Sequence, residues 1–152
     1  MPAVLPEAPP TRRACVVLLG GRPFAVDVTA AREIVVLHTT TRVPGAPASV
    51  LGVMKLRGSV LPVVEARPLL GLPAHLRSDR ALVLADGERC AAVVIEGVVG
   101  LAPLDEVDPV PAAAGDLAMG EVVAETGNRA TLLDAPALLA AIRRAWDPGP
   151  GG

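Results

Sequence analysis

The alternation of apolar runs with glycine-centred breaks is the clearest pattern along the chain. In each of three segments an apolar run, a short break containing glycine and a second apolar run follow one another, which is the sequence form of a β-hairpin. The segments are CVVLLGGRPFAVDV (15–28), ALVLADGERCAAVVI (81–95) and EVVAETGNRATLL (121–133). Glycine supplies the positive φ angles of a tight turn, so turns are predicted at Gly20-Gly21, Asp86-Gly87 and Gly127-Asn128.

A fourth pair of apolar arms, Val50–Met54 and Val60–Val64, flanks a charged break at Lys55–Ser59. Both arms are rich in valine and leucine, as half-buried strands are. Because side chains alternate along a strand, Lys55 and Arg57 are expected to share one face. A guanidinium beside an apolar surface suits the carboxylates or carbonyls of a partner protein. A hairpin-tip charge without any partner is the simpler alternative.

Further short strands are predicted at Glu33–Leu37 and Val98–Leu101, which brings the total to about ten. A turn or two of helix is expected at Thr29–Arg32 and at Arg67–Leu70. Short strands, frequent prolines and glycines, and no long helices between the strands favour small barrels over a parallel α/β sheet.

The best helix is predicted at Ala135–Trp146. Asp134 can serve as its N-cap, and Pro136 suits the first helical turn. Arg143 and Arg144 lie near its end, where positive charges complement the helix dipole.

Composition narrows the function classes. Hydrophobic residues make up 51% of the chain, yet Phe24 and Trp146 are its only aromatic residues, and the net charge is −2. Nucleic-acid binding relies on aromatic stacking and basic surfaces, so a nucleic-acid partner is not expected. The longest charge-free run, Val43–Met54, is far shorter than the roughly 20 apolar residues of a membrane span, so no membrane insertion is expected. Proteins are the expected partners.

Catalytic and metal-binding residues form no recognisable motif. His38 and His75 lie far apart, and no histidine, cysteine or acidic pair has the close spacing of a zinc site. The sequence contains neither a phosphate-binding glycine loop nor a GxSxG elbow. Cys15 and Cys90 are expected to be reduced thiols without a redox role. We therefore expect no enzyme activity, no metal and no cofactor.

The segment 44–67 resembles the signature of the CheW-like family, the adaptor proteins of bacterial chemosensory arrays. The signature is approximately P-x-x-P-x-x-[IV]-x-G-[VIL]-x-N-L-R-G-x-[IV]-x-P-[VI]-[VI]-D-[LV]-R. The matching residues are Pro44, Pro47, Val50, Gly52, Val53, Leu56, Arg57, Gly58, Val60, Pro62, Val63, Val64 and Arg67. Segments 24–35, 91–111 and 120–139 resemble other parts of the family, so the resemblance covers about residues 14–142.

The resemblance implies an all-β fold of two small five-stranded SH3-like β-barrels packed together, with a short C-terminal helix. The domain is expected at 14–146, with a first barrel at roughly 14–75 and a second at roughly 76–133. Alternatively, the last hairpin and the helix return to the first barrel. Flexible tails are expected at 1–13 and 147–152, and the first of them lacks a secretory pattern, which favours the cytoplasm.

The resemblance also implies a scaffold without chemistry. Such a scaffold couples chemoreceptor signalling tips to the CheW-like regulatory domain of the histidine kinase CheA, in arrays at the inner face of the membrane, and further CheW-like copies are candidate ring partners. The implied protein-binding residues are Glu33, Ile34, Gly52, Val53, Lys55, Arg57, Gly58, Leu61, Val93 and Val94. Of these, an apolar receptor groove between the barrels is assigned to Val53, Leu61, Val93 and Val94.

The chain departs from the family pattern at three positions. Lys55 stands where the signature has asparagine, and Glu65 and Glu96 stand where the family has aspartate. The added charge of Lys55 suggests a scaffold dedicated to one system, such as a motility pathway. Two alternatives stay open: a decoy or inhibitor with one working binding face, and an unrelated small β-barrel enzyme.

Overall fold

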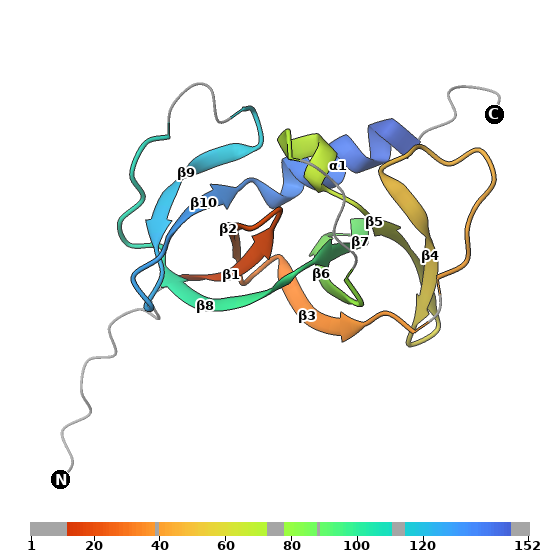
Figure 1. Ribbon diagram of the computed structural model, residues 1–152, viewed down its shortest axis with the longest axis horizontal. Coiled ribbons are helices and arrows are strands. Elements are labelled where there is room, and N and C mark those ends of the chain that lie inside the picture. Colours follow the sequence, from red (N-terminus) through yellow and green to blue (C-terminus); the bar gives the residue numbers. More distant parts are fainter. Residues whose placement is uncertain (1–11, 39, 73–77, 88, 111–114, 147–152) are drawn as a thin grey trace, which may run out of the picture.

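The structure, a computed structural model, describes residues 12–38, 40–72, 78–87, 89–110 and 115–146. The expected tails lie outside these residues, except that Arg12 and Arg13 are described and Arg13 already belongs to the first strand. Figure 1 shows the elements, which are β1 (Arg13–Leu19), β2 (Arg22–Asp27), β3 (Ala31–Val36), β4 (Val50–Leu56), β5 (Ser59–Val64), the 3₁₀-helix η1 (Arg67–Leu70), β6 (Arg80–Asp86), β7 (Arg89–Ile95), β8 (Gly97–Pro103), β9 (Ala118–Val123), β10 (Arg129–Leu133) and α1 (Ala135–Trp146).

Two of the three predicted helical segments are confirmed. Helix α1 has the predicted bounds, and the Asp134 carboxylate accepts a hydrogen bond from the backbone N–H of Ala137 at 3.0 Å, as an N-cap does. The prediction at Thr29–Arg32 is wrong. The Asp27 carboxylate accepts hydrogen bonds from both the N–H and the hydroxyl of Thr29, each at 2.9 Å, which favours a tight turn over a helix.

The strands form two five-stranded sheets, which confirms the predicted all-β architecture. The terminal barrel has the strand order β8-β1-β2-β10-β9, and the central barrel has the order β3-β6-β7-β5-β4. Figure 1 shows the two barrels side by side, with η1 and α1 above them.

The predicted division of the chain at about residue 75 requires correction. Strand β3 leaves the β1–β2 hairpin and pairs with β6, and β8 crosses back to pair with β1. Strand β10 then pairs in parallel with β2, so the last hairpin returns to the terminal barrel, as the alternative had it. The helix does not follow it, because α1 packs mainly against β6 and β7 of the central barrel. A hairpin pattern in the sequence identifies two strands that pair with each other. It carries no information on which other strands join them in the same sheet.

Three apolar clusters make up the core. One fills the terminal barrel, with Val16 and Val122 among its members, and one fills the central barrel, with Val63 and Val83. The largest lies between the barrels and beneath α1, where residues of both barrels pack against apolar helix residues such as Leu138. The barrels therefore share one continuous apolar interface.

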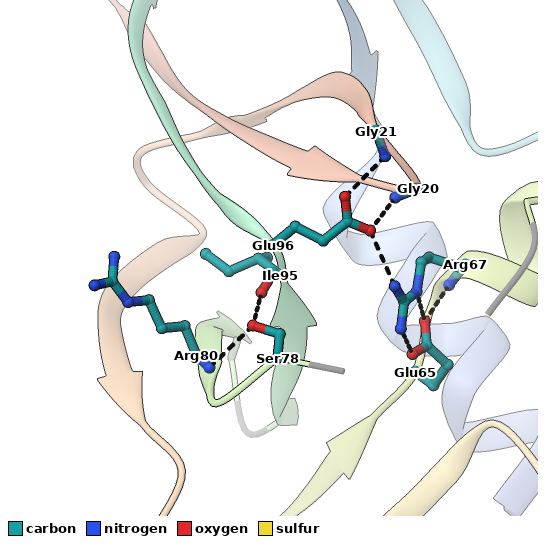
Figure 2. Close-up of polar contacts among 8 residues, drawn as sticks. All are labelled: Gly20, Gly21, Glu65, Arg67, Ser78, Arg80, Ile95 and Glu96. Carbon is teal, nitrogen blue, oxygen red and sulfur yellow. Dashed lines mark hydrogen bonds and ion pairs between the residues drawn. The ribbon is translucent and has the colours of Figure 1, made fainter. Parts of the chain in front are cut away.

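A buried ionic network also joins the two barrels (Figure 2). Arg67, at the start of η1, is 3% exposed and lies between the carboxylates of Glu65 and Glu96. Its Nε donates to Glu65 at 2.6 Å, and its Nη1 donates to Glu96 at 2.9 Å. Glu96 also accepts hydrogen bonds from the backbone N–H groups of Gly20 and Gly21, at 2.6 and 2.8 Å. The network thus connects η1, which follows β5, to the β1–β2 turn of the other barrel.

This network predicts that acid weakens the fold through Glu96. Burial acts to raise the pKa of the Glu96 carboxyl, but hydrogen bonds from Gly21 and Gly20 and the nearby Arg67 outweigh it, so the pKa lies below its ordinary value of 4.5. A carboxyl with a lowered pKa in the folded state stabilises the fold above the unfolded-state pKa, and the stabilisation is lost as pH falls through the folded-state pKa.

Urea unfolding at neutral pH and across the acid range measures this effect. The free energy of unfolding of the Glu96→Gln variant should depend less steeply on acid pH than that of the parent protein. Glu106→Gln, in an exposed loop, is the matched control and should keep the parental dependence. Equal slopes for all three proteins would contradict the assignment.

Position 52 of β4 requires glycine because the backbone at Thr41 passes close to it. A Cβ atom at this position would lie 2.4 Å from the carbonyl oxygen of Thr41, whose backbone pairs with Val53 next to it. The substitution Gly52→Ala is therefore expected to destabilise the fold by about 1–3 kcal/mol more than Gly100→Ala. Gly100 is a matched control because it also has a positive φ, +149° against +157°, but its added Cβ would make only ordinary contacts. Urea midpoints compare the two variants, and equal losses would show that the close approach is unimportant.

Candidate protein-binding site

The β4–β5 hairpin ends in a two-residue turn formed by Arg57 and Gly58. Leu56 pairs with Ser59, so the turn is shorter than the predicted break at Lys55–Ser59. The φ angles of Arg57 and Gly58 are +48° and +83°, both in the left-handed region, as in a type I′ turn. Among the described residues, Arg57 is the one non-glycine residue with a positive φ. Such conformations concentrate at functional sites, which makes the turn a candidate contact point.

The Arg57 guanidinium forms a two-pronged ion pair with Glu33 of β3. Nη2 donates to Oε1 at 2.8 Å, and Nη1 donates to Oε2. The pair links β3 to the turn that follows β4, and β3 and β4 are the two outer strands in the order of the central sheet. The Arg57 side chain nevertheless stays 72% exposed, and that of Glu33 28% exposed. The guanidinium is therefore held in place by Glu33 and remains accessible to a partner.

The ion pair shifts both pKa values in the direction that keeps both groups charged. The hydrogen bond from Arg57 and its positive charge hold the pKa of Glu33 below its ordinary value. The Glu33 carboxylate raises the pKa of Arg57 in turn. At neutral pH a partner therefore meets a charged pair, whose two groups can exchange hydrogen bonds with oppositely charged groups of that partner.

Three other predicted residues, Ile34, Val53 and Lys55, lie on β3 and β4. Ile34 is 41% exposed on the outward face of β3, and Val36 on the same face is 49% exposed. On β4, Lys55 is exposed and Val53 is half-buried. The strand alternation behind the expectation for Lys55 and Arg57 ends at Leu56, because Arg57 lies in the turn with a left-handed backbone.

The assignment of a receptor groove to Leu61, Val93 and Val94 requires correction. Each of these side chains is 3% exposed. Leu61 and Val94 pack inside the central barrel, and Val93 belongs to the cluster between the barrels. In a strand buried on both faces an apolar run has no exposed side, so the valines of 93–94 serve the core. Gly52 is likewise buried, where Thr41 approaches its backbone.

Two ion pairs were not predicted from the sequence. Glu33 and Arg57 were both predicted site residues, but their separation along the chain carries no signal that they contact each other. Glu65 and Glu96 were noted only as departures from the family pattern, although both carboxylates bind Arg67. The arginine at the end of the signature was the available signal, since a charge in an apolar segment needs a buried partner.

The described residues contain no group of three or more histidine, cysteine, aspartate or glutamate side chains arranged to hold a metal ion. In the same part of the chain, no helix has the length and apolar character needed to cross a membrane. Burial raises the pKa of both thiols, Cys15 and Cys90, which disfavours the reactive thiolate.

The known proteins that are similar in sequence to this chain share one family. The sequence profile of the CheW-like domain matches residues 13–143. The "Chemotaxis protein CheW" of Rhizobium meliloti (strain 1021) is 33% identical over 64% of this chain and 66% of its own length. That of Bacillus subtilis (strain 168) is 27% identical over 82% of this chain and 84% of its own length. The chain thus spans slightly less than two thirds of the first relative.

The fold is also found in a solved structure. The crystal structure of scaffolding protein TtCheW from Thermoanaerobacter tengcongensis superposes with a TM-score of 0.73, covering 84% of this chain and 87% of that one. Its sequence identity of 20% makes this a likeness of fold alone. Together with the profile, which spans nearly all of the described residues, these findings establish that the chain belongs to the CheW-like family.

Proposed function

We propose that this chain is a non-enzymatic adaptor that couples chemoreceptors to the histidine kinase CheA in a bacterial chemosensory array. Family membership supports the scaffold role, since relatives are named chemotaxis protein CheW and the similar structure is that of a scaffolding protein. The adaptor acts in the cytoplasm, at receptor arrays on the inner face of the membrane, where further CheW-like copies can join it.

The observation that carries the proposal is the exposed Glu33–Arg57 pair on a rigid turn. An adaptor must present charged groups in a fixed geometry without closing them off, because preorganised groups lose little conformational entropy on binding. The ion pair orients the guanidinium, and charged groups held in this way suit a specific protein interface. Ile34, the next residue of β3, adds exposed apolar surface on the opposite face of that strand.

Binding measurements against two purified partners test the proposal. The full chain is titrated with a chemoreceptor signalling-tip fragment and, separately, with the regulatory domain of CheA. An adaptor binds both partners and forms a ternary complex with them. Binding to only one would favour the decoy or inhibitor alternative, and binding to neither would refute both proposals.

Lys55 is proposed to set partner choice within this function. Its side chain is exposed on β4, one residue before Leu56 and the turn. We expect Lys55→Asn to change the affinity for at least one receptor or kinase of the same cell, because altered rim charges change which partners are tolerated. Arg80→Asn, an exposed cation on β6, is the control. Unchanged affinity for every receptor and kinase tested would remove Lys55 from the site.

A further inference from the structure

A groove opens where the two parallel strands β5 and β7 separate. Their pairing is limited to Val63 with Ala92 and Val64 with Val93. Ahead of these pairs, the segments 60–62 of β5 and 89–91 of β7 line a cavity of about 290 Å³. The C-terminal half of α1 closes its third side. Figure 1 shows this end of α1 pointing toward the β4–β5 side of the central barrel.

The lining of this seam groove is mainly apolar. Val53, Val60, Pro62 and Cys90 line it with partly or fully exposed side chains, and below them lie the almost fully buried Leu61, Ala91, Leu139 and Ile142. Val60 is 62% exposed, the highest value among the large hydrophobic residues that the structure describes. Small-molecule sites usually have volumes of about 300–1,000 Å³, so this groove is of a size to receive an apolar side chain.

The charged residues that line the groove are basic. Arg89 and Arg143 line it, and Lys55 lines the neighbouring cavity, which shares Val53 and Val60 with the groove. Among the residues that the structure describes, no acidic side chain lines either cavity. Within the described part of the chain these three cations form no ion pair, whereas Arg12, Arg57, Arg67 and Arg129 each do. A basic rim on a chain of net charge −2 complements an acidic partner.

We propose that the seam groove binds an acidic segment of a partner protein, with one apolar side chain seated between β5 and α1 and carboxylates reaching Arg89 and Arg143. Glu33 and Arg57 do not line this groove. The groove is therefore distinct from the surface formed by the turn, although Lys55 lies beside both, and its existence does not depend on the adaptor proposal. A partner can occupy it while the turn at Arg57 contacts another protein.

Selection from a random peptide library displayed on phage tests the chemistry directly. The full chain is the bait, and the Arg143→Glu variant is used for counter-selection. Selected peptides should be enriched in aspartate and glutamate around a large apolar residue, and Arg143→Glu should weaken their binding by at least about tenfold. Arg144→Glu is the matched control, because Arg144 is exposed on the same helical turn but does not line the groove.

Two results would overturn the proposal. One is a selection without acidic enrichment, and the other is an equal loss of binding in Arg143→Glu and Arg144→Glu. Circular dichroism of both variants checks that each remains folded. Because neither kinase nor receptor takes part in this experiment, its failure leaves the adaptor proposal standing, and failure of the adaptor proposal leaves this result unaffected.

Chemical blocking of the groove gives an independent readout. Cys90 lines the groove, so in a Cys15→Ala background N-phenylmaleimide should modify Cys90 and abolish binding of the selected peptides. Burial raises the pKa of the Cys90 thiol, so the rate of labelling should increase with pH. Full binding by the blocked protein would show that the peptides bind elsewhere.

A second copy of this chain is the competing occupant. The groove at the other end of α1 is lined by Asp27, which pairs with Arg12 there, and by Asp86 and Asp134, so it offers net negative charge to a basic rim. Sedimentation velocity over a concentration series distinguishes the two occupants. Self-association that Arg143→Glu abolishes and Arg144→Glu preserves would replace the partner segment with a second copy and overturn the proposal.

Discussion

The Arg57→Glu variant is expected to bind CheA or the receptor tip at least about tenfold more weakly than the parent protein. Reversal of the charge replaces the Arg57–Glu33 attraction with repulsion between two carboxylates on β3 and the turn. A partner group that accepted hydrogen bonds from the guanidinium then faces a like charge. Isothermal titration of each partner measures the loss, and urea unfolding shows whether the barrels stay folded.

A charge exchange separates two ways in which the pair can act. The double variant Glu33→Arg/Arg57→Glu restores an ion pair between β3 and the turn with the opposite polarity. Recovery of binding would mean that the partner needs the ordered turn, whereas continued loss would mean that the partner reads the guanidinium itself. Arg129→Glu, an exposed arginine paired with Glu121 and Asp108 in the other barrel, is the control. Unchanged binding by Arg57→Glu would leave Arg57 as an ordinary surface charge.

The Arg67→Met variant is expected to lose about 3–5 kcal/mol of unfolding free energy. Hydrogen bonds to Glu65 hold the pKa of Arg67 above its ordinary value in spite of burial, and the charges of Glu65 and Glu96 add to this. Removal of the cation leaves Glu65, with a side chain 8% exposed, and Glu96, 14% exposed, without their positive partner. An uncompensated buried charge is among the costliest single defects in a folded protein.

A double-variant cycle keeps this prediction testable even where the single variant unfolds. In Glu65→Gln/Arg67→Met a neutral amide replaces the Glu65 carboxylate, so part of the lost stability should return. The effects of the two substitutions on the unfolding free energy should therefore be strongly non-additive. Arg144→Met, an exposed arginine on α1, should change the unfolding free energy by no more than about 0.5 kcal/mol. Urea unfolding at neutral pH measures five proteins: the parent, Glu65→Gln, Arg67→Met, the double variant and the Arg144→Met control. Additive losses would show that Arg67 and Glu65 do not act together.

Local pattern was sufficient for most of the elements. Glycine-centred breaks located three hairpins, because a turn with positive φ needs glycine at a defined place between two apolar runs. Asp134 and Pro136 located the start of α1, because the unpaired N–H groups of a helix start need a cap. The failure at Thr29–Arg32 has the same origin, since the Asp27 side chain satisfies the backbone of a turn there instead.

The sequence indicated which residues belong to the candidate site, but not which of them contact one another. Arg57, Gly58 and Lys55 were recognisable because polar residues interrupt an apolar hairpin. The pairing of Arg57 with Glu33 was not, because it depends on β3 leaving its own hairpin for the other barrel. Val93 and Val94 were misassigned for a similar reason. A valine in a strand looks the same in the sequence whether it lines a groove or packs in the core.

The sequence by itself determined the class of this protein: an all-β chain with an aliphatic core, few aromatic residues, a capped C-terminal helix and the residues of the CheW-like signature. These properties follow from local forces, namely turn geometry, alternation and capping. The tertiary structure alone decided that β3 and β8 exchange barrels, that Arg67 holds the barrels together, and that Arg89 and Arg143 meet at one groove. Each of these depends on contacts between residues distant in the chain, where burial and charge act through space and leave no local pattern.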